Sequence, residues 1–272
     1  MSEINGSDSG SAVERLIASG AGATGVAAGG LVGFVVGGPV GAAIGGATGA
    51  LLQDGVKSTV TQVAERVTSQ SERERVGSCL LIAYELIAQR LNGGEELREP
   101  RFFERRKRRA QKDLRSEAEE LLEGTFLAAR DAYEERKVEL LARFYANAAF
   151  ARDIDSSHLN HILNLAKLLT YRQLVIIGVL GGLDRSAVRA TDYRGGGTLT
   201  PAVIGVLFEI YQMVGLDLIS SVDSSYMLGV ADINPSRLQL QGNGAHLFNL
   251  LRPDQVPEED RRFFFEALAP ST

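Results

Sequence analysis

The chain has 272 residues, of which 44% are hydrophobic, and a formal net charge of −5. This length is enough for one large domain or two small domains with a hydrophobic core. The negative charge excludes a general polyanion-binding protein. The single cysteine, Cys79, excludes an intramolecular disulfide framework and is typical of a reducing compartment. Because Cys79 lies in an apolar helical run, we expect a buried and unreactive thiol.

The amino terminus, residues 1–15, is polar and carries three acidic residues but only one basic residue, Arg15. A secretory signal begins with a basic segment, so this composition argues against one. We expect a short disordered arm.

Residues 16–53 form a run of 38 residues without charge. As one helix the run would be ~57 Å long, whereas the hydrocarbon core of a bilayer is ~30 Å thick. Gly37, Gly38 and Pro39 lie in its middle, where proline interrupts a helix and glycine adds conformational freedom. We therefore expect residues 16–55 to be a membrane segment with its hinge at these three residues. It forms either one tilted span or, as we favour, a helical hairpin.

Glycine recurs in this run in unbroken steps of four. Residues four apart share a helix face, and a face without side chains lets two helices approach closely, as small-xxx-small repeats do in membranes. The spacing predicts a glycine zipper that mediates homo-oligomerisation in the lipid bilayer. A tightly packed soluble hairpin and a flexible linker are the alternatives, although a linker would be richer in polar residues. The zipper positions are Gly25, Gly29, Gly33, Gly37, Gly41, Gly45 and Gly49.

The run is only moderately apolar, with ten Leu, Ile, Val and Phe residues between 20 and 53. At about −0.3 to −0.6 kcal/mol for each residue, insertion is marginal, so we expect it to need oligomerisation or a trigger. Arg15 alone precedes the run, whereas four basic residues follow it between 57 and 75. This asymmetry predicts that the carboxyl-terminal bulk lies in the cytoplasm, at the inner membrane if the source is bacterial.

Residues 56–152 are expected to form a helical bundle. A first amphipathic helix is predicted over about 56–70 from valines at helical spacing. A second, over about 73–91, ends at Asn92-Gly93-Gly94. A long third helix is predicted over about 116–151, with Gly124 as its point of interruption.

A basic stretch, residues 98–115, interrupts this helical region. It has nine basic and three acidic residues, a local charge of +6, and contains Phe102 and Phe103. Exposed aromatic side chains beside basic residues on a helix suit an anionic lipid surface. Nucleic-acid binding would use similar residues, and a solvated helix face with two core phenylalanines is a further alternative. The predicted lipid-binding residues are Arg101, Phe102, Phe103, Arg105, Arg106, Lys107, Arg108 and Arg109.

The carboxyl-terminal part is divided into a domain over 153–255 and a tail over 256–272. Helices are predicted to begin after Asp155, at Thr170 and at Thr200-Pro201, the last with proline in the first helical position. The segments LDLIS and RLQLQ are predicted strands, and a final helix follows the second. This order, over about 156–252, resembles a winged-helix domain, which implies a small α+β fold with 201–213 as the recognition helix.

The proposed recognition helix lacks the residues that read DNA. A DNA-reading helix presents Arg, Lys, Asn or Gln to base edges, but residues 201–213 contain no basic residue. Residues 156–272 hold 9 basic and 11 acidic residues. We therefore expect this domain to bind a protein partner and do not expect it to bind nucleic acid.

No motif for catalysis is found. His158 and His161 lie three residues apart, but no cysteine accompanies them, and His246 is alone. The RGGG segment at 194–197 lacks the Gly-Lys of a phosphate-binding loop. We therefore predict no enzyme activity, no cofactor, no metal and no catalytic residue.

Together these features predict a mainly α protein. It would comprise an N-terminal glycine-zipper transmembrane segment or helical hairpin, a helical-bundle middle and a small winged-helix-like α+β C-terminal domain. The predicted function is that of a membrane-associated, self-assembling protein that inserts into the bilayer or forms pores. In architecture it loosely resembles pore-forming bacteriocins and helical-bundle death effectors. A static membrane-anchored adaptor and a soluble winged-helix regulator are the alternatives.

Overall fold

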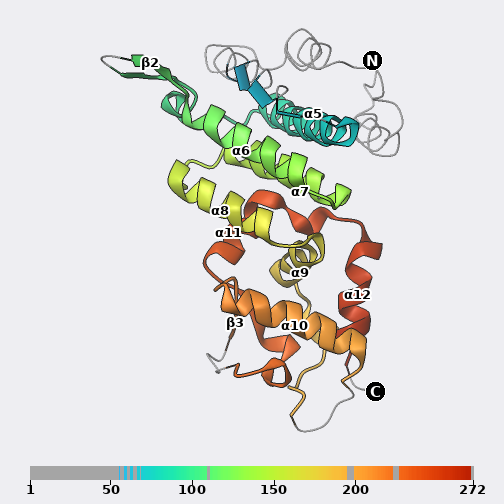
Figure 1. Cartoon of the computed structure of the whole chain (residues 1–272). Helices are drawn as coiled ribbons and strands as arrows, with labels where there is room; N and C mark the ends of the chain where they lie inside the picture. The colour runs from blue at the N-terminus through green and yellow to red at the C-terminus, as the bar shows by residue number, and fades with distance from the viewer. Residues whose placement is uncertain are drawn as a thin grey trace, which may run out of the picture. The chain divides into compact units, whose positions relative to one another are not determined.

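The computed structural model describes residues 55, 58–59, 62–63, 66–67, 69–108, 111–194, 199–222 and 227–270. This described part is mainly helical, with eight α-helices and two small antiparallel sheets of two strands each (Figure 1), which confirms a mainly α protein. The chain divides into two compact units, Met1–Ser156 and Ser157–Thr272. The predicted glycine zipper and its hinge lie outside the described residues.

Helix α5 (Gln70–Asn92) matches the predicted second helix and contributes much of the core of the first unit. It begins at Ser69, whose hydroxyl accepts from the Glu72 amide at 3.2 Å while the Glu72 carboxylate accepts from the Ser69 amide at 2.9 Å. It ends as predicted, because Gly94 adopts a φ of 85°, a conformation that favours glycine. Cys79 lies at the centre of its buried face, and burial raises the pKa of its thiol to about 12.

The predicted long third helix is two helices, α6 (Glu117–Asp131) and α7 (Glu135–Ala148). The prediction that Gly124 interrupts it is wrong, since Gly124 lies within α6 and the break falls at Ala132, Tyr133 and Glu134. At the break the Arg75 guanidinium donates from Nε and Nη2 to the Arg130 carbonyl, at 3.1 and 2.8 Å. This contact satisfies the end of α6, and both helices pack against α5.

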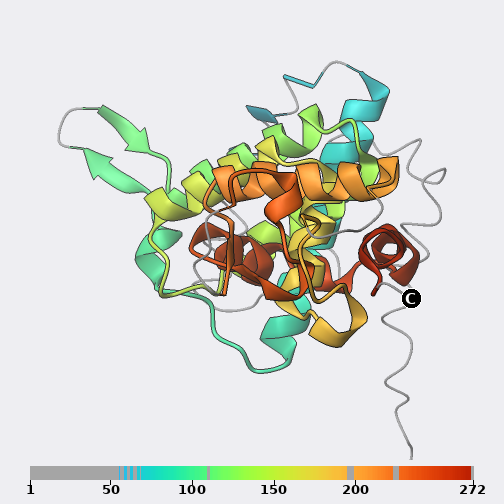
Figure 2. The same ribbon diagram turned by 90° about the horizontal axis from the view of Figure 1, so that it is seen from below.

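The basic stretch is a β-hairpin and not a helix. A short 3-10 helix, η1 (Pro100–Phe102), precedes strands β1 (Arg106–Arg108) and β2 (Gln111–Leu114), which pair antiparallel. The two strands project from the helices of their unit (Figures 1 and 2). The prediction that these basic residues lie on a helix is therefore wrong.

In the second unit, α9 (Tyr171–Gly181) is the central helix, with Leu174, Val175, Ile176 and Ile177 all fully buried. The predicted start is confirmed, because the Thr170 hydroxyl accepts from the Gln173 amide at 3.1 Å. Helix α8 (Ser156–Leu168) precedes it. No single helix among the described residues is both long and apolar enough to cross a bilayer. Among the described helices, α8 and α9 reach the length and apolar composition of a membrane span only when taken together, and the chain bends by 117° between them.

Helix α10 (Pro201–Gly215) begins as predicted, with Thr200 capping the Val203 amide and proline in the first turn. Strand β3 (Ile219–Ser221) follows it directly and pairs antiparallel with β4 (Leu238–Leu240). The intervening chain includes the 3-10 helices η3 (Val230–Asp232) and η4 (Pro235–Arg237). A helix, a short strand, a long connection and an antiparallel strand thus follow one another over residues 201–240.

Helices α11 (Asn243–Leu251) and α12 (Glu258–Leu268) complete the second unit, linked by η5 (Pro253–Gln255). The expectation of a tail over 256–272 is wrong for most of that segment. Helix α12 packs against α9 and α10, and its Phe264 and Leu268 are fully buried. Apolar residues at helical spacing after an acidic first turn were the signal for this helix.

Candidate interaction surfaces

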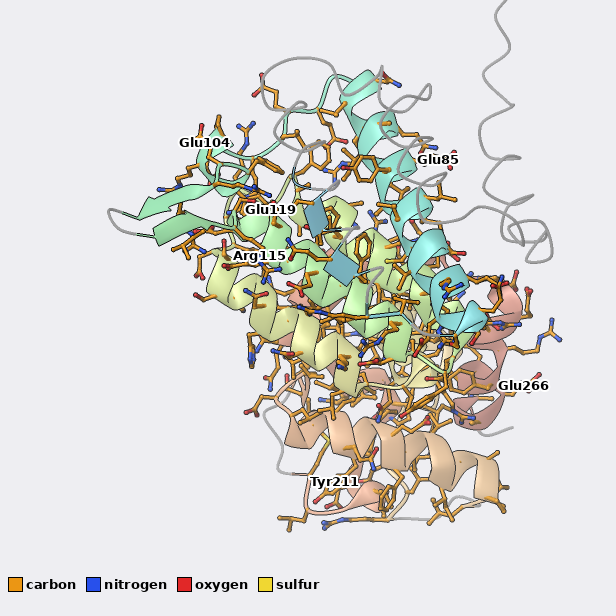
Figure 3. All side chains as sticks on the ribbon, turned by 45° about the horizontal axis from the view of Figure 1, so that its top comes forward. Glu85, Glu104, Arg115, Glu119, Tyr211 and Glu266 are labelled. Carbon is orange, nitrogen blue, oxygen red and sulfur yellow. The ribbon has the colours of Figure 1, made fainter. Side chains whose placement is uncertain are left out.

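The arginines at the base of the hairpin are bound to carboxylates of α6. Arg105 donates from Nε to both carboxylate oxygens of Glu119 at 3.1 Å, and Arg106 lies 3.1 Å from Glu120. Arg115 forms an ion pair with Glu123. Figure 3 shows Glu119 and Arg115 together at the base of the strands. Much of the positive charge of this stretch is therefore neutralised within the protein.

Glu119 is the most enclosed of these acids, with 1% of its side chain exposed. Burial raises its pKa, but hydrogen bonds from Arg105 and from the Ser116 backbone amide, together with the charge of Arg105, outweigh burial and lower the pKa below its ordinary value. Glu119 is thus ionised and holds both the hairpin and the start of α6, where its carboxylate accepts from the Ser116 amide at 2.8 Å.

The two phenylalanines of the basic stretch are core residues. Phe102 and Phe103 are 1% and 3% exposed, and their rings meet edge to face at 5.0 Å between centroids. Arg98, also buried, stacks over the Phe102 ring at 4.2 Å. This is the arrangement that the alternative of two core phenylalanines predicts. Neither ring is available to enter a membrane.

Among the predicted lipid-binding residues, Arg101 is the most exposed of those whose side chains the structure describes. Its side chain is 86% exposed, and its guanidinium lies 3.4 Å from Glu99. Lys107 and Arg108 lie on β1, but their side chains and Arg109 are outside the described part. Lipid binding by Lys107, Arg108 and Arg109 therefore stays a prediction.

The solvent-facing side of α10 is apolar. Of the nine large hydrophobic residues that are exposed in the described part, five lie on this helix or beside it. Phe208 is 53% exposed, and the Tyr211 hydroxyl donates to the Leu228 carbonyl at 3.2 Å, which brings Leu228 to the helix. We call this surface the α10 face; its exposed apolar residues are Leu199, Ile204, Phe208, Leu216 and Leu228.

Among the described residues, α10 itself contributes one charged side chain to this surface, and the exposed Asp217 directly follows Leu216. The sole charged residue of α10 is Glu209, which is half-buried and accepts from Arg172 at 2.8 Å. Burial raises the pKa of Glu209, and the Arg172 charge partly offsets this effect. Exposed apolar patches without charge mark sites that bind protein or lipid, whereas a DNA-binding surface requires cations.

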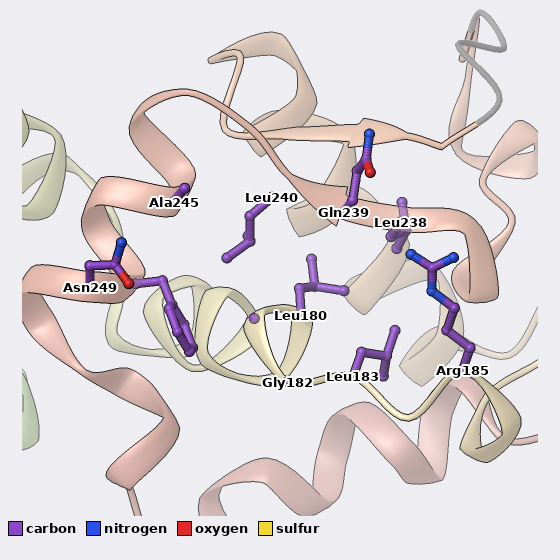
Figure 4. A pocket seen from close by; sticks show the side chains of 11 residues that line it. Leu180, Gly182, Leu183, Arg185, Leu238, Gln239, Leu240, Ala245 and Asn249 are labelled. Atoms are coloured by element: carbon purple, nitrogen blue, oxygen red, sulfur yellow. The ribbon is translucent and has the colours of Figure 1, made fainter.

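A pocket of about 420 Å³ lies between α9, β4 and α11 in the second unit (Figure 4). Leu180, Leu183 and Leu240 contribute apolar walls, and Arg185 and Asn249 lie toward opposite ends of it. Its shape depends on Gly181, because a Cβ there would lie 2.1 Å from the Phe248 ring. Its size is within the range of small-molecule sites.

The three histidines of the chain lie close together, although the sequence suggests that His246 is alone. The His158 and His246 rings meet edge to face at 4.8 Å between centroids, and the His158 and His161 rings are 6.4 Å apart. His158 Nε2 lies 2.8 Å from Asn243 Oδ1. Within the described ranges no group of three or more His, Cys, Asp or Glu side chains is placed to hold a metal ion.

Comparison with known proteins found no match among family models, curated proteins or solved structures. The surfaces therefore have to be interpreted from their own chemistry. Sequence reasoning found the absence of basic residues on α10 but missed the exposed Phe208 and Ile204. The two residues lie four positions apart, a spacing that is equally typical of a buried helix face, so no signal of their exposure was present in the sequence.

Proposed function

We propose that the protein is a membrane-associated, self-assembling protein whose glycine zipper packs in the bilayer and whose C-terminal unit binds a protein partner through the α10 face. The observation that carries the membrane role is the charge-free run of 38 residues, within which glycine recurs in steps of four from Gly25 to Gly49. In this proposal the segment inserts into the membrane and permeabilises it, and the C-terminal unit regulates insertion.

The C-terminal unit is proposed to be winged-helix-like, with α10 in the place of the recognition helix and β3 and β4 as the wing. Support comes from the order of a capped helix, a strand, a long connection and an antiparallel strand. The α10 face is apolar and its one acid is neutralised by Arg172, so base reading is disfavoured and protein binding is favoured.

The membrane role is tested by replacing Gly29, Gly33, Gly41 and Gly45 with leucine in the full chain. We expect the protein to fractionate with membranes, and the wild type to release a dye from anionic vesicles while the variant does not. The control variant carries leucine at Gly30 and Gly46, which lie outside the four-residue repeat. This variant should still release the dye.

The outcomes separate the alternatives. Undiminished leakage by the zipper variant contradicts the role of the repeat. Membrane fractionation without leakage indicates a static anchor, and a wild-type protein that stays in the supernatant without detergent indicates a soluble regulator.

A further inference from the structure

One edge of strand β4 forms a wall of the pocket in the second unit. All three residues of the strand, Leu238, Gln239 and Leu240, line the pocket. Successive side chains of a strand point to opposite faces, and Figure 4 shows the side chains of Gln239 and Leu240 pointing in different directions. Because consecutive residues with alternating side chains all reach the cavity, the cavity borders the edge of the strand, where the backbone lies.

The hydrogen bonds to β3 show which backbone groups lie on this edge. The Val222 amide donates to the Arg237 carbonyl at 2.8 Å, just before β4. Just after β4, the Gln241 amide donates to the Leu218 carbonyl at 3.0 Å. Hydrogen-bonded pairs recur at every second residue of an antiparallel ladder, so Gln239 is the residue of β4 whose backbone faces β3.

The backbone groups of Leu238 and Leu240 therefore point to the free edge. The Leu238 amide donates to the Pro235 carbonyl. The Leu240 amide and the carbonyls of Leu238 and Leu240 have no hydrogen-bond partner among the described residues, because the sheet has two strands and β3 lies on the other side. An unpaired edge of this kind is a template on which another strand can pair.

The rest of the pocket is apolar and contains one charge. Leu180, Leu183 and Phe248 supply apolar walls beside the strand edge. Arg185, in the 3-10 helix η2 (Arg185–Ala187), is the only charged residue of the lining. Neither aspartate nor glutamate lines the pocket. The site is therefore complementary to a group that is apolar and carries a negative charge.

The guanidinium of Arg185 is available to a ligand. Its side chain is exposed and has no ion pair or hydrogen bond within the part of the chain that the structure describes. The acid next to it in sequence is engaged elsewhere, because the Asp184 carboxylate accepts from the Ser186 amide at 2.9 Å and from the Ser186 hydroxyl at 2.8 Å. An unpaired guanidinium is a strong donor to a carboxylate.

We propose that the free edge of β4 and the adjoining pocket bind an extended segment of a partner protein as an added strand. The backbone of the segment pairs with Leu238 and Leu240, one of its apolar side chains enters the pocket, and one of its carboxylates binds Arg185. We call this place the β4 edge site. It shares no residue with the α10 face and does not depend on the proposed membrane role.

The combination of features favours a peptide over other ligands. A fatty acid would satisfy the apolar walls and Arg185 but would leave the backbone groups of Leu238 and Leu240 unpaired. A nucleic acid would require more than one cation. An added strand satisfies all three features. Because β4 is short and the contact is small, we expect a Kd on the order of 10–100 μM.

The first test selects peptides from a random octapeptide library against the full chain in detergent. Enriched peptides should carry an apolar residue close to an acidic residue. In fluorescence anisotropy with the synthetic peptides, Arg185→Glu should weaken binding at least about tenfold, because like charges then meet. Replacing the acid of the peptide with lysine should restore binding to this variant. The control is Arg262→Glu, which changes an exposed arginine of α12 outside the pocket and should leave binding unchanged.

The second test asks whether the peptide binds as a strand. Each peptide amide is methylated in turn. Methylation should weaken binding at least about tenfold at residues whose amides face β4 and have little effect at the residues between them, which gives a period of two. The Leu240 amide should also exchange more slowly with solvent in the complex.

Three results overturn the proposal: a selection that enriches no peptide, binding that Arg185→Glu leaves unchanged, and uniform tolerance of amide methylation. If octanoate binds at Arg185 while no selected peptide does, the pocket takes a small amphipathic acid and the assignment of a peptide is wrong. These measurements need no vesicles, so their failure is separate from failure of the proposed function, which vesicle leakage tests.

Discussion

The basic stretch and α10 are two surface elements of opposite character, one highly charged and the other largely apolar. The basic stretch has a local charge of +6, but its arginines at the base of the hairpin lie in ion pairs with Glu119, Glu120 and Glu123. The one charged residue of α10, Glu209, is paired with Arg172, and Phe208 protrudes from the helix with half of its surface exposed. The more conspicuous of the two in sequence is therefore the one whose described arginines already have carboxylate partners within the protein.

This difference teaches that a charge run is evidence for a binding surface only after its partners are known. A buried carboxylate needs a cation, so the acids of α6 and the arginines of the hairpin stabilise one another. An exposed phenylalanine has no comparable use within its own unit. Substitutions in the two elements, and in the units that carry them, test this contrast.

The largest effect is expected from the buried Phe264 of the second unit, with the exposed Phe208 as its comparison. Phe264→Ala in α12 should lower the free energy of unfolding by about 3–5 kcal/mol, because the ring is fully buried and its loss leaves a cavity. Phe208→Ala should cost less than about 1 kcal/mol, because solvent already covers half of the ring. Urea unfolding measures both. Equal losses would contradict the free state of the α10 face.

Two helical glycines should respond to alanine with opposite signs. Gly178→Ala should destabilise the protein by about 2 kcal/mol or more, because the added Cβ would lie 2.3 Å from a backbone oxygen of Pro253. Gly205→Ala should stabilise the protein by about 0.5–1 kcal/mol, since alanine favours the helix and meets nothing. Thermal unfolding of both variants provides the comparison. A destabilising Gly205→Ala would indicate an internal neighbour.

Arg105 and Arg101 distinguish an internal ion pair from an exposed charge. Arg105→Gln should cost about 2 kcal/mol, because it leaves the enclosed Glu119 carboxylate without its cation, although half of the Arg105 side chain is solvated. Arg101→Gln should change the free energy of unfolding by less than about 0.5 kcal/mol. Urea unfolding of both variants is the measurement. A large loss for Arg101 and none for Arg105 would reverse the assignment of the stretch.

The smallest effect is a change in pH dependence. The pKa of Glu119 in the folded protein lies below its ordinary value of 4.5, so its contribution to stability is complete above that pH. The contribution is lost as the pH falls through the lower, folded pKa, because the unfolded chain then binds more protons. Glu119→Gln should therefore reduce the slope of stability against pH below about pH 4.5. Parallel acid unfolding curves for the wild type and the variant would contradict this.

Local signals predicted the ends of several helices. Gly93-Gly94 after α5, Thr170 before α9 and Thr200-Pro201 before α10 satisfy or remove the backbone groups left at helix ends, and this chemistry needs only neighbouring residues. The strands predicted over 216–220 and 237–241 are found at 219–221 and 238–240, and they too were signalled locally, since short apolar runs follow turn residues.

Distant contacts decided the rest. The break between α6 and α7 contains no glycine or proline, and Arg75 contacts it from another helix. The basic stretch pairs as a hairpin because acids of α6 hold its arginines.

The sequence by itself determined the mainly helical fold, the charge-free glycine repeat, the buried thiol and the lack of cations on α10. These features follow from composition and from interactions within a few turns of the chain. Only the tertiary structure decided that Phe102 and Phe103 are buried, that three histidines meet and that Phe208 is exposed. Burial depends on which elements pack together, and apolar residues at helical spacing do not reveal whether their face will be covered.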